Sequence, residues 1–248
     1  ICGHALAGFL IAFLGISTTF FIILLFVVTG YSFLYRLSIK PVLVTATTKT
    51  WQSVKEGIQY VFKTKEILGA LSLDLFAVLF GGAVALVPVF AKDILHTGPI
   101  GFGWLNAATD IGSIITVTFL TIRPLHRSQG RILFYAVAGF GVCIILFAVS
   151  NMFWLSFAAL LMSGCMDGVS VIVRGTILQL KTPDELRGRV MSVNSMFINS
   201  SNELGQFESG VMAKLLGTVN SVIFGGGMTI AVVIITWFKA PALRKMEY

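Results

Sequence analysis

Long apolar runs separated by short polar turns dominate the chain. A helix needs about 20 apolar residues, each adding about 1.5 Å, to cross a hydrocarbon core of about 30 Å. A first apolar piece at 1–14 is too short to span, which fits a chain cut inside a helix, and a turn is expected at 15–18. Spanning helices are then predicted at about 19–35, 67–91, 100–122, 131–150, 152–176, 190–214 and 218–238.

The only long polar stretch, 36–66, predicts a cytoplasmic linker. Its portion at 54–62 places apolar residues at helical spacing on one side and charged residues on the other. Such an amphipathic helix either lies on the membrane surface or caps a bundle, and an ordinary solvated connector is an equal alternative. The chain is therefore expected to consist of a piece at 1–35, this linker, a six-helix bundle at 67–238 and a cytoplasmic tail at 239–248.

The basic residues are distributed unevenly between the two sides of the predicted membrane. With residues 36–66 inside, alternate crossings place 15 of the 18 Lys and Arg residues on the cytoplasmic side. Only Lys92 and Lys214 lie outside, and Arg174 falls within a segment. Because Lys and Arg concentrate in cytoplasmic loops, this asymmetry supports both the number of crossings and the orientation.

The composition agrees with a membrane protein and argues against other classes. Hydrophobic residues make up 56% of the chain and charged residues 12%, with a net charge of +7 and a mean hydropathy of +0.90. A soluble domain carries about 25% charged residues, so a soluble enzyme, a disordered chain and a nucleic-acid binder fit poorly. Three cysteines and three histidines lack metal-ligand spacing, and no G-x-S-x-G or H-E-x-x-H motif is present. No enzyme activity, metal or cofactor is expected.

Several charged residues nonetheless fall inside the predicted spans. Each such charge costs about 2.5–3.5 kcal/mol near a helix centre on insertion scales, so it normally faces a bundle interior or a solute pathway. The segments at 131–150 and 218–238 carry none and are expected to face lipid, whereas the other four of the bundle surround something polar. The charged residues concerned are Asp74, Asp110, Asp167, Arg174, Glu203 and Glu208.

Spacing refines this picture. Asp167 and Arg174 are seven residues apart, so they share a helix face about 10 Å apart, and each is expected to find a partner on a neighbouring helix. A polar stripe follows one face of the next segment. Its members are Ser195, Asn199, Asn202, Glu203 and Gln206. Two interpretations stay open: a cavity lining, or interhelical hydrogen bonds and structural ion pairs.

Small residues interrupt several of the apolar segments. Gly164 and Gly168 form a G-x-x-x-G pattern, and Gly81 and Gly82 are adjacent. Because such residues permit close approach of two helix backbones, close packing is the favoured interpretation.

Two turns on the cytoplasmic side combine arginine with glycine. One contains Arg127, Gly130 and Arg131, and the other contains Arg187, Gly188 and Arg189. A tight turn at the mouth of a helix lets a guanidinium reach a neighbouring carboxylate or helix C-terminus, which suits a gate. Simple anchoring at the membrane surface is the competing interpretation.

The sequence around the second turn reads Leu-Gln-Leu-Lys-Thr-Pro-Asp-Glu-Leu-Arg-Gly-Arg-Val at 178–190. It resembles the segment before the eleventh helix of major facilitator superfamily transporters. Residues 55–62, 68–71 and 86–90 are similar to the linker and seventh helix of the branch typified by the enterobactin exporter and macrolide efflux proteins. The resemblance implies that 1–35 is the end of an N-terminal bundle, with part of helix five and all of helix six. The bundle at 67–238 then holds helices seven to twelve, and the remaining N-terminal half is its partner.

The resemblance implies a multi-pass protein of the bacterial inner membrane that exports a drug or siderophore by proton-coupled alternating access. Asp74, Asp110, Asp167 and Glu203 are the titratable candidates, with Arg174 as a counter-charge. Two departures weaken the analogy: Gly3 to Gly8 keeps only the outer glycines of the exporter motif G-P-x-x-G-G, and 127–131 lacks the Asp of the inner-loop motif. An importer and a non-transporting receptor or scaffold stay open as alternatives.

Overall fold

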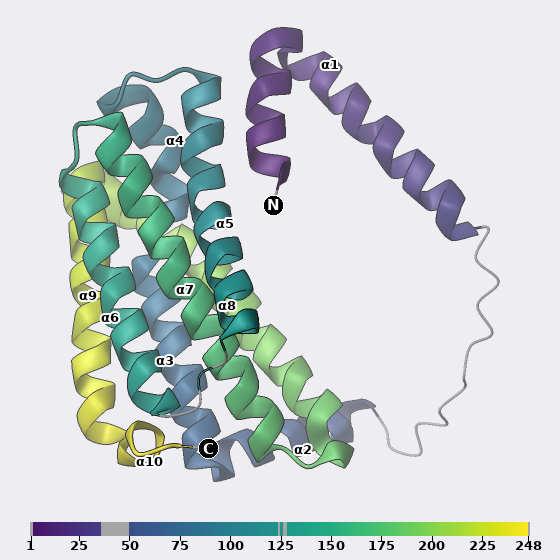
Figure 1. Ribbon diagram of the computed structural model, residues 1–248, viewed down its shortest axis with the longest axis vertical. Coiled ribbons are helices and arrows are strands. Elements are labelled where there is room, and N and C mark those ends of the chain that lie inside the picture. Colours follow the sequence, from purple (N-terminus) through teal and green to yellow (C-terminus); the bar gives the residue numbers. More distant parts are fainter. Residues whose placement is uncertain (1, 36–49, 124, 126–127, 248) are drawn as a thin grey trace.

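The computed structural model describes residues 2–35, 50–123, 125 and 128–247, and every regular element within these ranges is helical (Figure 1). The elements are α1 (Cys2–Tyr35), α2 (Thr50–Lys63), α3 (Lys65–Gly81), η1 (Ala83–Leu86), α4 (Val87–Val89), η2 (Phe90–Ile94), α5 (Pro99–Ile122), α6 (Gln129–Val149), α7 (Phe153–Lys181), α8 (Asp184–Leu216), α9 (Thr218–Lys239) and α10 (Pro241–Arg244). The all-α architecture expected from the sequence is confirmed.

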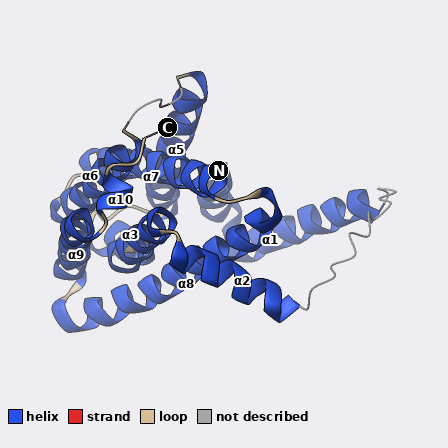
Figure 2. Ribbon diagram, turned by 90° about the horizontal axis from the view of Figure 1, so that it is seen from below, coloured by secondary structure: helices blue, strands red, loops and turns tan. Residues whose placement is uncertain are grey.

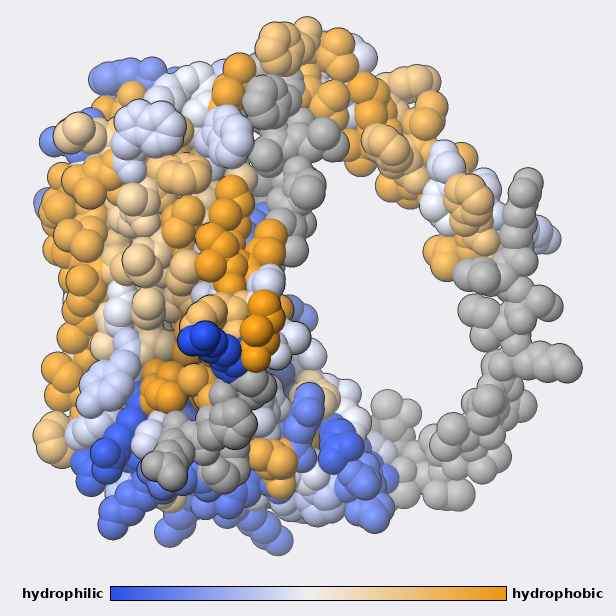
Figure 3. All heavy atoms as spheres, viewed as in Figure 1, coloured by the Kyte–Doolittle hydropathy of each residue, from blue (hydrophilic) through white to orange (hydrophobic). Residues whose placement is uncertain are grey.

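The long helices form a bundle with two different ends. Helix α3 packs between α8 and α9, and α7 packs between α5 and α6 (Figure 2). Helices α2 and α10 lie at one end, and α4 lies at the other (Figure 1). Hydrophilic side chains gather at the end that carries α2 and α10, which we call the basic end, while apolar side chains cover the sides (Figure 3).

Among the described residues, five helical segments are long and apolar enough to cross a membrane. They are Phe13–Tyr35, Pro99–Ile122, Gln129–Val149, Phe153–Lys181 and Thr218–Lys239. The predicted span at 190–214 lies within one helix, whereas the one at 67–91 is broken at Gly82, and neither is among these five. Helix α3 has only 17 residues before the chain continues through η1, α4 and η2, and the polar positions of α8 lower its mean hydropathy.

Two helices break or end at glycines, and only the first break was predicted. Helix α1 breaks at Gly15, where φ is 75° and ψ is 168°, a left-handed backbone conformation that favours glycine. The break falls within the turn expected at 15–18. Helix α3 ends at Gly81, and Gly82 begins the passage into η1.

Glycines also set the distance between α5 and α7. A Cβ atom on Gly164 would stand 2.1 Å from the carbonyl oxygen of Thr109, and one on Gly112 would stand 2.0 Å from that of Leu161. The hydroxyl of Ser113 donates to the Gly164 carbonyl at 3.1 Å, and that of Thr116 donates to the Cys165 carbonyl at 3.0 Å. The close-packing interpretation of the G-x-x-x-G pattern is confirmed.

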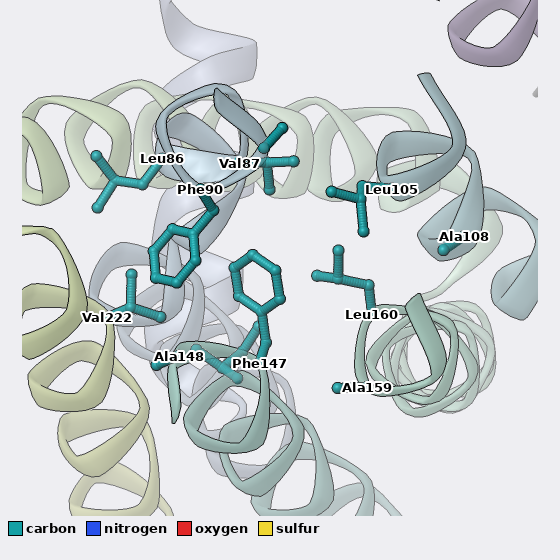
Figure 4. Packing of buried hydrophobic residues seen from close by; sticks show 12 residues of the cluster. Leu86, Val87, Phe90, Leu105, Ala108, Phe147, Ala148, Ala159, Leu160 and Val222 are labelled. Carbon is teal, nitrogen blue, oxygen red and sulfur yellow. The ribbon is translucent and has the colours of Figure 1, made fainter. Parts of the chain in front are cut away.

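An apolar cluster closes the bundle at the end opposite the basic end (Figure 4). The rings of Phe90 and Phe147 lie in its centre with centroids 4.6 Å apart. Leu105 of α5 and Leu160 of α7 complete it from the other side (Figure 4). Thr109 of α5 and Ser163 of α7 follow these leucines by about one helical turn, so the cluster borders polar positions in the middle of the bundle.

Candidate functional site

A cavity of about 270 Å³ lies within the bundle, between α3, α5, α6, α7 and α8. Four of the residues predicted from the sequence line it: Asp110, Asp167, Asn202 and Gln206. Thr109, Ser113 and Ser163 add hydroxyl groups, and Val78 and Phe140 contribute apolar surface. The cavity therefore offers two carboxylates, two amides and three hydroxyls within an otherwise apolar membrane segment.

Asp167 connects this cavity with a buried ion pair. It also lines a smaller cavity of about 20 Å³, which it shares with Asp74 and Ser170. Asp74 of α3 forms a salt bridge with Arg174 of α7, and the two side chains are 9% and 6% exposed. The prediction of a partner on a neighbouring helix is confirmed for Arg174, whereas Asp167 has no ion-pair or hydrogen-bond partner among the described residues.

Ser170 lies between Asp167 and Arg174 along α7, about one helical turn from each. Its hydroxyl oxygen is buried and has no hydrogen-bond partner within the described ranges. Three polar side chains of one helix therefore lead from the cavity to the ion pair.

Only some residues of the polar stripe of α8 line the cavity. All five residues of the stripe are exposed. Asn202 and Gln206 also line the cavity, whereas Ser195, Asn199 and Glu203 do not. Glu203 is rotated by about 100° from Asn202, and Ser195 lies about two turns nearer the basic end. Close to the other end of α8, Glu208 is half-buried, and one of its carboxylate oxygens lacks a hydrogen-bond partner among the described residues.

Sequence reasoning missed the hydroxyl groups of the cavity and the role of α6. Thr109 and Ser113 are four residues apart and share a helix face, a signal that the search for charges overlooked. The expectation that 131–150 and 218–238 face lipid is correct only in part. In the most apolar 18-residue stretch of each helix, 50% of α6 and 39% of α9 are buried, because both helices pack against neighbouring helices. In addition, Phe140 of α6 lines the cavity.

The first of the two arginine-glycine turns is described in part. Arg127 lies outside the described residues, and Arg131 is exposed. Gly130 packs against the C-terminal segment: its backbone N–H donates to the Met246 carbonyl at 3.3 Å, and a Cβ atom there would stand 1.8 Å from the Leu243 carbonyl oxygen. Gly130 therefore permits close contact between α6 and α10.

The residues of the second predicted turn lie inside α8, just as Gly130 and Arg131 lie inside α6, so the expectation of turns at these positions was wrong. This part of α8 contacts the linker helix. Arg189 forms a salt bridge with Glu56 of α2, whereas Arg187 pairs with Asp184 of its own helix at 2.7 Å on the surface. Gly188 has open space around its Cα. The expectation that an arginine of this turn reaches a neighbouring carboxylate is confirmed for Arg189.

Helix α2 caps the bundle at the basic end. Besides the salt bridge, the Tyr60 hydroxyl donates to the Lys181 carbonyl at 2.5 Å. A Cβ atom on Gly57 would stand 2.9 Å from the Arg189 carbonyl oxygen, so the two backbones are in close contact. Of the interpretations left open by the sequence, the structure supports the cap.

Replacing Glu56 by Gln is expected to loosen α2 from α8. The variant loses a charge-assisted contact, which contributes about 1 kcal/mol at such a partly exposed position. Amide hydrogen exchange over 50–63 should become faster by about fivefold in the full-length protein. Lys55→Gln, which changes an exposed neighbour of Glu56, is the control. Unchanged exchange in Glu56→Gln would show that this ion pair does not hold the helix.

Comparisons with known proteins agree with this architecture. The sequence pattern of the family described as transmembrane secretion effector, of the major facilitator superfamily (MFS), matches residues 1–248. The chain is 23% identical over 253 residues to an uncharacterized MFS-type transporter of Bacillus subtilis (strain 168), YfmI, with 98% of this chain and 61% of that protein covered. It is 26% identical over 216 residues to another from the same strain, YkuC, with 79% and 46% covered. The chain thus spans about half to three-fifths of the length of these relatives. It belongs to the transmembrane secretion effector family of MFS-type transporters.

Proposed function

We propose that this chain forms the C-terminal half of a secondary active transporter that moves a small molecule across the bacterial inner membrane. The observation that carries the proposal is the cavity that Asp110 and Asp167 share between α5 and α7. Membrane-embedded acids of this kind mark solute and ion pathways. The substrate site is completed by an N-terminal half, and rocking of the two halves exposes it to each side in turn.

Transport is coupled to protons through the acids near the cavity. Asp167 is the primary candidate because it lines both the cavity and the smaller space beside the Asp74–Arg174 ion pair. A proton on Asp167 changes the charge that a substrate meets in the cavity. Each elementary charge that crosses the membrane with the cycle contributes about 2.3 kcal/mol per 100 mV.

The direction is export, and the substrate is a drug or a siderophore, in keeping with the enterobactin-exporter and macrolide-efflux branch. The family description as a secretion effector supports export. The linker, the C-terminus and the basic end lie in the cytoplasm, since Lys and Arg concentrate there. The protein acts without enzymatic chemistry, and within the described residues no group of three or more His, Cys, Asp or Glu could hold a metal ion.

The experiment uses the full-length gene in an efflux-deficient host. Accumulation of fluorescent drugs and of a catecholate siderophore is measured with and without a protonophore. We expect lower accumulation of one class, and we expect the protonophore to abolish the difference. Higher accumulation than in the empty host would favour an importer, and no change with confirmed expression would favour a receptor or scaffold.

Asp167→Asn is expected to abolish the protonophore-sensitive part of this transport, because an amide cannot exchange a proton with the cavity. The control is Asp93→Asn, an exposed acid of η2 outside the cavity, which should retain transport. Protonophore-sensitive efflux by Asp167→Asn at the native rate would refute coupling through this residue.

A further inference from the structure

A second, larger groove lies on the outside of the bundle between α3 and α9, at the basic end. Its volume is about 770 Å³, within the range of about 300–1,000 Å³ typical of ligand pockets. Phe76 and Phe80 of α3 and Met228 and Val232 of α9 form its apolar length. Phe76 is 45% exposed, so the groove opens to the surroundings of the bundle.

The groove has the length of one membrane leaflet. It follows α3 from Lys65 to Phe80, and 15 residue steps of a helix cover about 22 Å. Half of a bilayer of about 40–45 Å, headgroup regions included, is about 20–22 Å. An acyl chain whose headgroup lies at the membrane surface would therefore fit along the groove without crossing to the other leaflet.

Two lysines stand at the mouth of the groove. Lys65 is the first residue of α3 and Lys239 is the last residue of α9, and both are exposed. Neither forms a salt bridge with any residue that the structure describes. The nearest acid along the chain, Glu66, pairs with Lys181 at 3.7 Å instead.

We propose that this groove binds an anionic phospholipid of the cytoplasmic leaflet. The phosphate lies between Lys65 and Lys239, and one acyl chain lies along Phe76, Phe80 and Val232. The proposal rests on the orientation proposed above, which places the basic end at the anionic cytoplasmic surface, and basic pockets between spanning helices are suited to such headgroups. An apolar groove that ends in unpaired cations matches an amphiphile with a single negative head.

The test measures lipid retention by native mass spectrometry of the full-length protein, after exchange into detergent with phosphatidylglycerol or phosphatidylcholine of identical acyl chains. We expect retention of phosphatidylglycerol in preference to phosphatidylcholine. A basic residue near an anionic headgroup contributes about fivefold in affinity, so Lys65→Gln/Lys239→Gln should lower phosphatidylglycerol affinity by about 25-fold. The readout is binding, so it is independent of whether the protein transports.

Two further variants separate the groove from general charge effects. Lys55→Gln/Lys63→Gln removes the same charge from exposed positions of α2 at the same end but outside the groove, and should retain native affinity. Val232→Trp fills the groove with both lysines present and should lose the lipid. Equal retention of both lipids by the native protein, or native affinity in Lys65→Gln/Lys239→Gln, would overturn the proposal. A lipid-free dimer that Val232→Trp dissociates would also overturn it, because the groove would then be an interface between copies.

Discussion

Replacing Arg174 by Met in the full-length protein should lower the free energy of unfolding by about 3–5 kcal/mol, the cost of leaving one member of a buried ion pair without its partner. Asp74 is buried and pairs with Arg174 across α3 and α7. Without the guanidinium, its carboxylate has no counter-charge in a membrane-embedded bundle. Titration of the purified protein with SDS, followed by tryptophan fluorescence, measures the change.

The double variant Asp74→Leu/Arg174→Met provides the control. Replacing both members of a buried pair by apolar residues of similar size is often neutral or stabilising, so most of the lost stability should return. Its transport separates two roles of the pair: retained protonophore-sensitive efflux assigns it to structure, and lost efflux assigns it to the pathway. If Arg174→Met unfolds at the native SDS fraction, the pair contributes no stability to the bundle.

Gly164→Val should disrupt the contact between α5 and α7. Even the first added carbon would stand 2.1 Å from the carbonyl oxygen of Thr109, and backbone atoms cannot rotate away as a side chain can. Separating the helices also breaks the hydrogen bonds that Ser113 and Thr116 donate to α7. Overpacking of this kind costs about 1–3 kcal/mol or more, and the shift of Asp110 relative to Asp167 should reduce transport as well.

Gly175→Ala is the control, because it adds a side-chain carbon to another glycine of the same helix. Gly175 also lies in α7, but a Cβ atom there would meet no atom within 4 Å. Gly175→Ala should therefore change stability by no more than about 1 kcal/mol, and in the stabilising direction, because alanine favours a helix. Equal stability of Gly164→Val and the native protein in SDS titration would show that α5 and α7 do not approach as closely as the structure describes.

Several features could be predicted because their signals are local. Apolar runs and periodicity located the helices, and the turn expected at 15–18 contains the break of α1 at Gly15. The end of α3 at Gly81 was not predicted. The cost of burying charge singled out Asp74, Asp110, Asp167 and Arg174. Helix propensity and partition into the membrane act on each segment separately. The pattern within one segment is therefore sufficient to locate a helix.

Such patterns could not predict which residues of the site contact one another. The sequence left Arg174 without an assigned partner, and it grouped Glu203 with Asn202 although only Asn202 lines the cavity. Likewise, an arginine near a turn has many possible partners, and Arg189 meets Glu56 because α2 folds back onto the start of α8.

Local sequence patterns are thus sufficient to identify the helices of this protein and the residues that are costly to bury. Which of those residues meet depends on the rotation and axial offset of each helix against its neighbours. Contacts far apart in the chain set these quantities, such as Gly164 against Thr109 and Gly225 against the Phe80 carbonyl. Adjacent residues of a helix point in directions about 100° apart. The rotation of a helix against its neighbours therefore decides whether an acid faces the cavity or the lipid.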